Sequence, residues 1–279
     1  MHYDLGPGSD RRGFLLGMAG ALLAAPVFAG AHSGKLDLSK PEDAFTAKLR
    51  MQGRLDERDA PWWYFGRIYG IVGETAPRLL VRFEGLEIPR FTKTLEGQYA
   101  ASGVTTSFFQ DPYTKQVLQE FKNPYTGKTN AVSPNMLGGT ADPVVFHSIR
   151  GTRPARVAEA DWTYGSGHDV WDFHDEHVWI SHDRVYPPGI PQPMGESSVG
   201  RARLEDLLDT SRAYCPAGFS STYFAPWPRW MEMAGQPGHV VWHADGVKLD
   251  GIDALPRDFR ERMEKLYPDR LYAKPWKPA

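Results

Sequence analysis

The sequence predicts a mainly-β protein, either an antiparallel β-barrel of the lipocalin-like or calycin-like kind or a β-sandwich, with short helices near the two ends. Short runs of β-branched and aromatic residues recur along the chain, turn-forming residues separate them, and helical periodicity appears only near the ends. We favour the barrel, because runs that are apolar on both faces suit a wall that packs outward on helices and inward on a cavity.

The N-terminal segment has the pattern of an export signal. Arg11 and Arg12 precede an uncharged run from Phe14 to Ala25, and Ala29-Gly30-Ala31 supplies the small residues that a signal peptidase accepts. The pattern resembles a twin-arginine signal, which implies that the twin-arginine translocase carries the folded chain across a bacterial inner membrane into the periplasm. The run is shorter than the roughly 20 apolar residues of a membrane-spanning helix, so we expect no permanent membrane span.

We therefore predict that residues 1–31 are a signal peptide and that residues 32–279 form a single mainly-β domain, a length that barrels and sandwiches reach without dividing. The alternative is a segment that stays attached as a membrane anchor. Because the twin-arginine pathway transports folded proteins, export also favours a metal or cofactor, without identifying one.

The domain is expected to begin with a helix and two strands. Ser39-Lys40-Pro41-Glu42 has the hydroxyl, proline and glutamate of a capping box, and Gly53 is a typical helix end. The run from Trp62 to Val72 is apolar on both faces, which predicts a buried strand. Apolar and charged residues alternate over 79–84, which predicts a strand with one face in water.

A repeated turn predicts an up-and-down meander from Val104 to Val132. Asp111-Pro112-Tyr113-Thr114 returns twelve residues later as Asn123-Pro124-Tyr125-Thr126, and in each copy an Asx residue and a proline stand where a β-turn needs them. Two copies are too few for a solenoid. Further short strands are predicted at 143–149, 162–164, 170–173, 178–180, 222–224 and 240–243.

Three later segments complete the expected architecture. Asp245-Gly246 predicts a hairpin turn. The proline-rich run from Pro187 to Pro193 cannot pair in a sheet and predicts a surface loop. Pro256 to Leu266 predicts a final helix, whose apolar face is expected to hold Phe259, Met263 and Leu266.

The composition favours a small-molecule site over a nucleic-acid site. The formal net charge is -2, which gives nucleic acid no electrostatic attraction. Nine Trp, twelve Tyr and fourteen Phe are an unusual supply of rings, and such rings line sites for aromatic or sterol-sized ligands. The alternative is that strands simply favour aromatic residues. Cys215 has no partner for an intramolecular disulfide and is expected to be a small buried residue rather than a nucleophile.

The segment from Gly165 to Asp183 concentrates four of the nine histidines. If 170–173 and 178–180 are paired strands, His174 and His177 flank the turn between them, near Asp172. Imidazole and carboxylate are usual ligands of zinc and other divalent ions, so His174, His177 and His182 are candidate metal ligands. The spacing matches no zinc-protease signature, and a solvated hairpin tip explains the same pattern.

A metal-free acid and base site is the second possibility for this segment. Asp172, His174 and His177 are then the candidate catalytic residues, because histidine titrates near neutrality. The candidate ligand-binding residues are Tyr164, Trp171, Trp179 and His243. His239 and His243 share one strand face and are equally well explained as hydrogen-bonded core residues. The sequence contains no phosphate-binding glycine loop and no dinucleotide fingerprint.

Several of these features together resemble an exported bacterial family called domain of unknown function 1838. They are the twin-arginine start, Trp62-Trp63-Tyr64, Glu87-Ile88-Pro89-Arg90-Phe91, the turn Asn123-Pro124-Tyr125-Thr126-Gly127 and the tryptophan-rich histidine hairpin. The resemblance spans most of the mature chain. It implies no reaction, no cofactor and no catalytic residue.

The sequence thus leaves three functions open. The first is a periplasmic barrel that binds a hydrophobic, aromatic or polycyclic small molecule, either to carry it or to transform it. The second is a metal-dependent periplasmic enzyme that uses the cluster at 168–183, with a divalent ion such as zinc. The third is an envelope interaction module without a small-molecule site.

Overall fold

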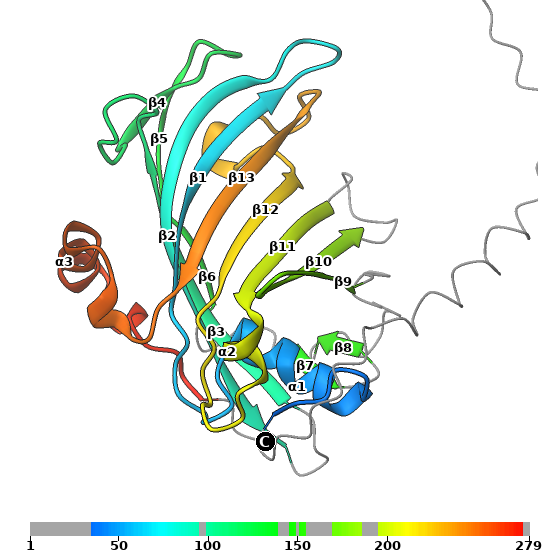
Figure 1. Cartoon of the computed structure of the whole chain (residues 1–279). Coiled ribbons are helices and arrows are strands. Elements are labelled where there is room, and N and C mark those ends of the chain that lie inside the picture. The colour runs from blue at the N-terminus through cyan, green and yellow to red at the C-terminus, as the bar shows by residue number, and fades with distance from the viewer. Residues whose placement is uncertain are drawn as a thin grey trace, which may run out of the picture.

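Figure 1 shows the computed structural model, which describes residues 35–94, 99–138, 145–148, 151–154, 169–185 and 195–275. The helical elements are α1 (Pro41–Gln52), α2 (Leu204–Leu208) and α3 (Arg257–Leu266), with 3-10 turns η2 (Arg229–Met231), η3 (Ile252–Ala254) and η4 (Pro268–Arg270). The strands are β1 (Trp62–Ile71), β2 (Arg78–Lys93), β3 (Tyr99–Gln110), β4 (Glu120–Lys122), β5 (Thr129–Ala131), β6 (Asn135–Gly138), β7 (Val145–Ser148), β8 (Gly151–Pro154), β9 (Asp169–His174), β10 (His177–Val185), β11 (Gly195–Arg203), β12 (Gly218–Ala225) and β13 (His239–Lys248).

Eleven of these strands form one antiparallel sheet. Neighbours follow the order β8-β7-β3-β2-β1-β13-β12-β11-β10-β9, β6 also pairs with β3, and β4 and β5 form a separate hairpin. The prediction of a mainly-β, barrel-like antiparallel fold with short helices is confirmed. The closed barrel that we favoured is not what the described strands form. Among them, no pairing joins the two end strands, β8 and β9, so the sheet is curled but open between them.

The two faces of the sheet carry different helices. Side chains alternate between the faces, so the strand register assigns each residue to one of them. On one face, each residue of the following row lies directly opposite the next on the neighbouring strand: Ile180, Gly200, Phe219, Gly246, Tyr64 and Gly85. We call this the inner face, and α1 packs on it against Ile180. Leu86 is the next residue after Gly85, and it lies on the outer face, where α3 covers it.

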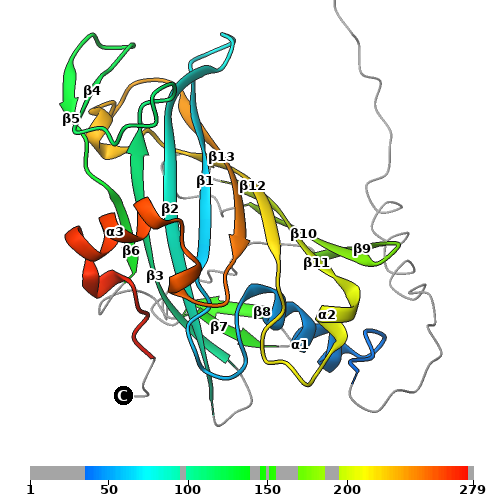
Figure 2. The same cartoon turned by 60° about the vertical axis from the view of Figure 1, so that its left-hand side comes forward.

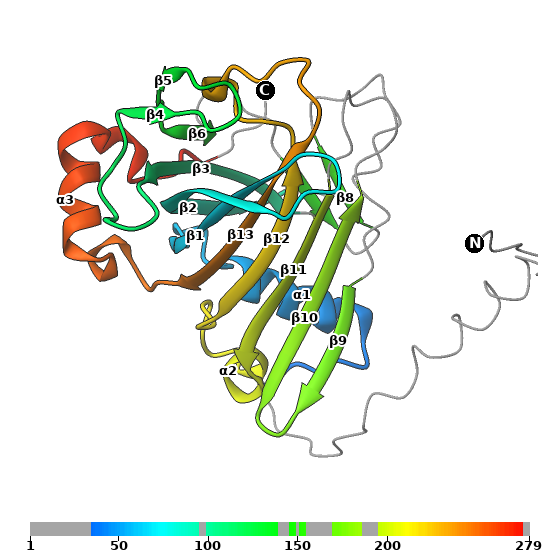
Figure 3. The ribbon, with the colours of Figure 1, turned by 90° about the horizontal axis from the view of Figure 1, so that it is seen from above.

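The inner face is covered at its two ends and curls between them (Figures 1 and 3). At one end, α1 contributes Ala47 and Met51 to a core with Val178 and Ile180. At the other end, η2 and the β4–β5 hairpin cover β1, β2 and β13, and Met231 and Phe121 join the core there. Figure 2 shows α3 on the opposite side of the sheet from α1.

Most predicted elements are confirmed. The helix spans Pro41–Gln52 and ends before Gly53, and the strand expected from Trp62 is β1. Both Asx turns form: Asp111 Oδ1 accepts hydrogen bonds from the backbone N–H groups of Tyr113 and Thr114 at 2.9 and 2.7 Å, and Asn123 Oδ1 accepts one from Tyr125 at 2.9 Å. Among the described residues, no helix has the length and apolar character that crossing a membrane requires.

Three local predictions are wrong, each for a physical reason. Ser39 does not cap α1, because its hydroxyl donates to Asp37 Oδ1 at 2.6 Å instead. Asp245-Gly246 is not a turn but the interior of β13. Leu266 does not join the buried face of α3 with Phe259 and Met263, and 51% of it is exposed. The loop predicted at 187–193 and the strand at 162–164 lie outside the described residues.

Candidate functional site on the inner face

A continuous series of aromatic rings crosses the inner face. Successive ring centroids lie 5.1 to 6.4 Å apart, within the range of favourable edge and tilted contacts. The series runs in the order Phe121, Trp230, Phe109, Trp242, Phe83, Tyr64, Phe219 and Trp62. The outermost rings at the hairpin end come from the covering layer, and the others come from β1, β2, β3, β12 and β13.

Glycines let this series pack closely against the sheet. A Cβ atom on Gly85 would lie 2.4 Å from the ring of Tyr64, and one on Gly246 would lie 2.3 Å from the ring of Phe219. Any larger residue would push these rings away from the backbone. The turn predicted at Asp245-Gly246 was wrong for this reason: the glycine is present because the Phe219 ring packs closely on it inside β13, and not because the chain turns there.

Polar groups interrupt the rings in the middle of the inner face. The Tyr64 hydroxyl and Ser107 Oγ are hydrogen-bonded at 2.7 Å in a buried position. Burial raises the pKa of the Tyr64 hydroxyl, so it stays protonated throughout the neutral range. On the β10–β12 side, Ser221 lies opposite Ser198, and Ser198 lies opposite His182, whose carbonyl accepts a hydrogen bond from Ser198 Oγ at 3.3 Å.

The centre of the inner face is only partly covered. Phe219, Ser221, Tyr223 and Trp242 are half-buried, although they lie on interior strands of the sheet. The same holds for a second group on β9, β10 and β11, namely Trp171, His182, Glu196 and Ser198. Half-buried rings beside hydroxyl, imidazole and carboxylate groups are the usual lining of a small-molecule site.

The side chain of Lys248 fixes α1 at its end of the inner face. The Lys248 side chain is buried, and its Nζ donates hydrogen bonds to the carbonyl oxygens of Arg50, Met51 and Gly53. Trp62 Nε1 donates to the carbonyl of Gln52 at 2.9 Å. The last carbonyl groups of a helix have no hydrogen-bond donors within the helix. Here Lys248 and Trp62 of the sheet donate to them.

The structure divides the predicted site residues between the two faces. Trp171 on β9 and His182 on β10 lie on the inner face. The outer face holds Asp172, His174, His177, Trp179 and His243. Tyr164 and His168 lie outside the described residues. The three candidate metal ligands therefore do not converge, since His182 is on the other face from His174 and His177.

The predicted turn between His174 and His177 is present, and the two residues pair across it. Their rings lie 5.4 and 5.7 Å from that of Trp179. His174 and Asp172 are exposed, so this end of the hairpin is solvated on its outer face. In the described part of the chain, no group of three or more His, Cys, Asp or Glu residues is arranged to hold a metal ion.

His243 belongs to a polar row on the outer face of β12 and β13. Thr222 Oγ1 lies 3.3 Å from His243 Nδ1, His243 Nε2 lies 3.9 Å from Asp245 Oδ2, and Ser220 Oγ donates to Asp245 Oδ1. Asp245 stands between Ser220 and His243, so this serine lacks the direct contact with a base that a nucleophile needs, and the hydroxyl that does contact the imidazole is that of Thr222. About half of the His243 side chain is exposed, so the row lies on a solvated surface of the sheet.

Cys215 is buried beside α1, and burial raises the pKa of its thiol. A raised pKa keeps the thiol protonated and unreactive. The structure therefore agrees with the expected small buried residue. The inner-face residues that the sequence analysis missed are chiefly Tyr64, Ser107, Ser198, Phe219 and Ser221. The two-residue period of a strand over 219–223 could have placed Phe219 and Ser221 on one face. Ser198 lies in a strand with no apolar pattern, so no comparable signal was available for it.

Together these features define a class of protein: a curled antiparallel sheet with helical covers at its ends and an aromatic inner face. Residues 57–277 match the family described as Protein of unknown function (DUF1838), and the chain belongs to that family. The match confirms the family named from the sequence, over residues 57–277. The comparisons with curated proteins and with solved structures found no match.

Proposed function

We propose that the protein is exported to the periplasm and binds a hydrophobic, aromatic small molecule on its inner face. The observation that carries the proposal is the half-buried group Phe219, Tyr223 and Trp242 in the middle of a wide sheet. Residues at such positions are normally covered by another layer, and here the described helices cover only the two ends. A flat ring that stacks on these side chains would complete the layer.

The polar residues supply orientation in this proposal. Ser221 and Ser198 place hydroxyl groups beside the rings, and His182 and Glu196 lie at the neighbouring positions of β10 and β11. A ligand with a polar substituent on an aromatic skeleton would match both kinds of lining. Imidazole and carboxylate groups also act as general acids and bases in enzymes. A bound molecule with an exchangeable proton would therefore lie beside groups that can accept or donate that proton.

Neighbouring serines on β11 provide a matched test of the site. Ser198→Leu places a larger side chain on the inner face, and Ser197→Leu places the same side chain on the outer face, where Ser197 is exposed. With 1-naphthol as the probe and tryptophan fluorescence as the signal, we expect Ser198→Leu to weaken binding by about tenfold or more, because leucine fills the ligand's space. Ser197→Leu should bind as the wild type does.

Equal affinities in the two variants and the wild type would refute the inner-face site. A second measurement addresses the natural ligand. Protein purified from the periplasm is extracted with organic solvent, and the extract is compared with that of Ser198→Leu by mass spectrometry. A compound released from the wild type and absent from Ser198→Leu supports the proposal, whereas identical extracts count against it.

The export part of the proposal rests on Arg11 and Arg12 and has its own test. Replacement of both arginines by lysine keeps the charge but removes the pattern that the twin-arginine translocase recognises. We expect the double variant to remain in the cytoplasm with its signal uncleaved, as measured by cell fractionation and mass spectrometry. Undiminished export of the double variant would show that another pathway carries the chain.

A further inference from the structure

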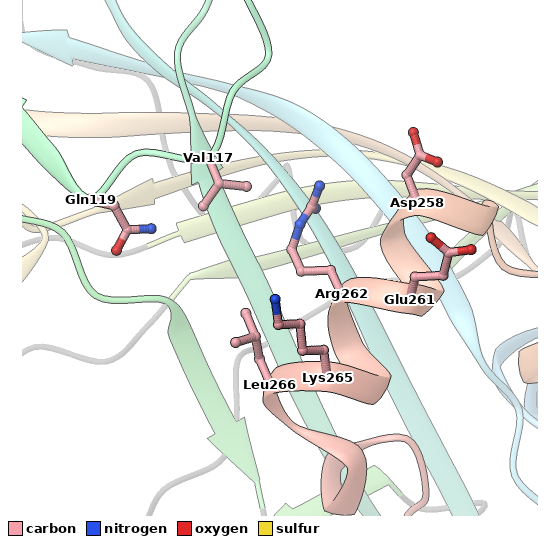
Figure 4. A pocket seen from close by; sticks show the side chains of 7 residues that line it. All are labelled: Val117, Gln119, Asp258, Glu261, Arg262, Lys265 and Leu266. Carbon is pink, nitrogen blue, oxygen red and sulfur yellow. The ribbon is translucent and has the colours of Figure 1, made fainter.

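A groove lies on the outer face, on the opposite side of the sheet from the aromatic series, between α3 and the segment that follows β3 (Figure 4). Its volume is about 420 Å³, within the range of small-molecule sites. The lining residues are Val117 and Gln119 from that segment and Asp258, Glu261, Arg262, Lys265 and Leu266 from α3. No step of the proposed function uses this groove.

Two contacts position Arg262 in the groove. Its Nη1 lies 3.5 Å from Glu84 Oε2, and its guanidinium carbon lies 5.3 Å from the ring centroid of Phe108. The Glu84 carboxylate already accepts hydrogen bonds from Trp63 Nε1 and Gln110 Nε2, both at 3.1 Å. Arg262 Nη1 is buried against Glu84, so the donors left for a ligand are Nε and Nη2, on a side chain that is 25% exposed.

The charges around the groove are arranged asymmetrically. Figure 4 shows Arg262 and Lys265 directed toward Val117, whereas Asp258 and Glu261 point away along the other side of α3. Glu261 accepts a hydrogen bond from Arg257 Nε at 2.8 Å, so its charge is balanced outside the groove. Within the described structure, Lys265 has no ion pair or hydrogen bond to its side chain. The groove therefore offers an incoming ligand the Lys265 ammonium and the exposed part of the Arg262 guanidinium, with the Asp258 and Glu261 carboxylates on its other side.

We propose that this groove binds a small organic carboxylate. The carboxylate would lie between Arg262 and Lys265 and accept charge-assisted hydrogen bonds from both, which are stronger than hydrogen bonds between neutral groups. Its apolar part would cover Val117 and Leu266, which accounts for a leucine that is 51% exposed at the end of α3. The Gln119 amide is placed to donate a further hydrogen bond. The proposal does not depend on the inner-face site.

Benzoate and its neutral analogue benzamide test the proposal by isothermal titration calorimetry on the full-length mature protein. We expect saturable binding of benzoate and none of benzamide, because the cations recognise the charge. Lys265→Gln should weaken benzoate binding about tenfold, the usual effect of losing one charged hydrogen bond. Gln119→Glu should abolish it, because it adds a repelling carboxylate without removing a contact of Arg262.

Lys128→Gln is the matched control, since it removes one positive charge from an exposed turn that does not line the groove. It should leave benzoate binding unchanged. Ser198→Leu should also leave it unchanged, which separates this groove from the inner face. The proposal is overturned if the wild type shows no saturable benzoate binding, if benzamide binds equally, or if Lys128→Gln has the same effect as Lys265→Gln.

Discussion

Lys248 Nζ lies 2.9 Å from the carbonyl oxygen of Met51, so the last residue of β13 caps the C-terminus of α1. The same Nζ also lies within hydrogen-bond distance of the carbonyls of Arg50 and Gly53, and the Tyr214 ring covers it at 4.9 Å. Arg50 in turn donates to the carbonyls of Leu207 and Asp206, at the end of α2. These contacts fix the helix that covers one end of the inner face.

Lys248→Met should destabilise the protein substantially. Methionine fills a similar volume but leaves buried carbonyl groups without donors, and we expect a loss of about 3 kcal/mol in the free energy of unfolding. Urea denaturation measures this loss. Lys128→Met, at an exposed turn, should change stability by less than about 0.5 kcal/mol. A similarly small change for Lys248→Met would show that the cap does not hold α1.

The stability of the wild type should rise with pH between about 7 and 9. Burial lowers the pKa of Lys248 from 10.5 to about 7, and the Arg50 and Arg54 cations act in the same direction. The unfolded chain regains the ordinary value, so in this window it binds more protons than the folded chain, and unfolding becomes harder as the pH rises.

The Lys248→Met variant tests this pH effect directly, because it should lose the rise. The comparison is made below pH 9, since the raised pKa of the Cys215 thiol has the opposite effect above that point. Urea midpoints of both proteins at several pH values supply the measurement. Parallel pH profiles would contradict the lowered pKa.

Gly246→Ala should destabilise the sheet by about 1–3 kcal/mol, because its methyl group would lie 2.3 Å from the Phe219 ring. Gly251→Ala is the control, since no atom lies within 4 Å of the corresponding position. In a Phe219→Leu background the cost of Gly246→Ala should fall. An unchanged cost in that background would place the strain elsewhere.

His174→Ala should change the free energy of unfolding by less than about 0.5 kcal/mol, because His174 is exposed at the hairpin end, whereas His177→Ala should cost more, since His177 is half-buried against Trp179. Val178→Ala shows the sensitivity of the assay: Val178 is fully buried and its truncation should cost about 2 kcal/mol. Elemental analysis of the exported protein, wild type and His174→Ala, addresses the metal alternative. A stoichiometric transition metal that the substitution removes would revive it.

Local residue chemistry made much of the fold predictable. The strand at Trp62, the helix at Pro41 and the Asx turns all follow from local chemistry, and all are present. β11 was missed because Gly195–Arg203 contains serines and glycines where a strand signal needs apolar residues. Those small residues suit the inner face, where Gly200 lies against Met51. Their role depends on contacts with distant parts of the chain.

The candidate site was predicted less well than the fold. The histidines of 168–183 were grouped by their closeness in sequence, yet alternation along β10 sends His177 to the outer face and His182 to the inner face. Strict use of the two-residue period would have separated them. The aromatic series joins residues more than a hundred positions apart, such as Phe83 and Trp242, and only the register of β1 with β2 and β13 brings them together.

The central claim is that the inner face receives an aromatic molecule, and a crystal of the protein soaked with a bromonaphthol tests it most directly. Anomalous scattering locates the bromine atom without reference to any assumed pose. The account predicts one dominant bromine peak on the inner face, beside Phe219 and Trp242. A dominant peak on the outer face near Trp179, or no bound bromine anywhere, would contradict it.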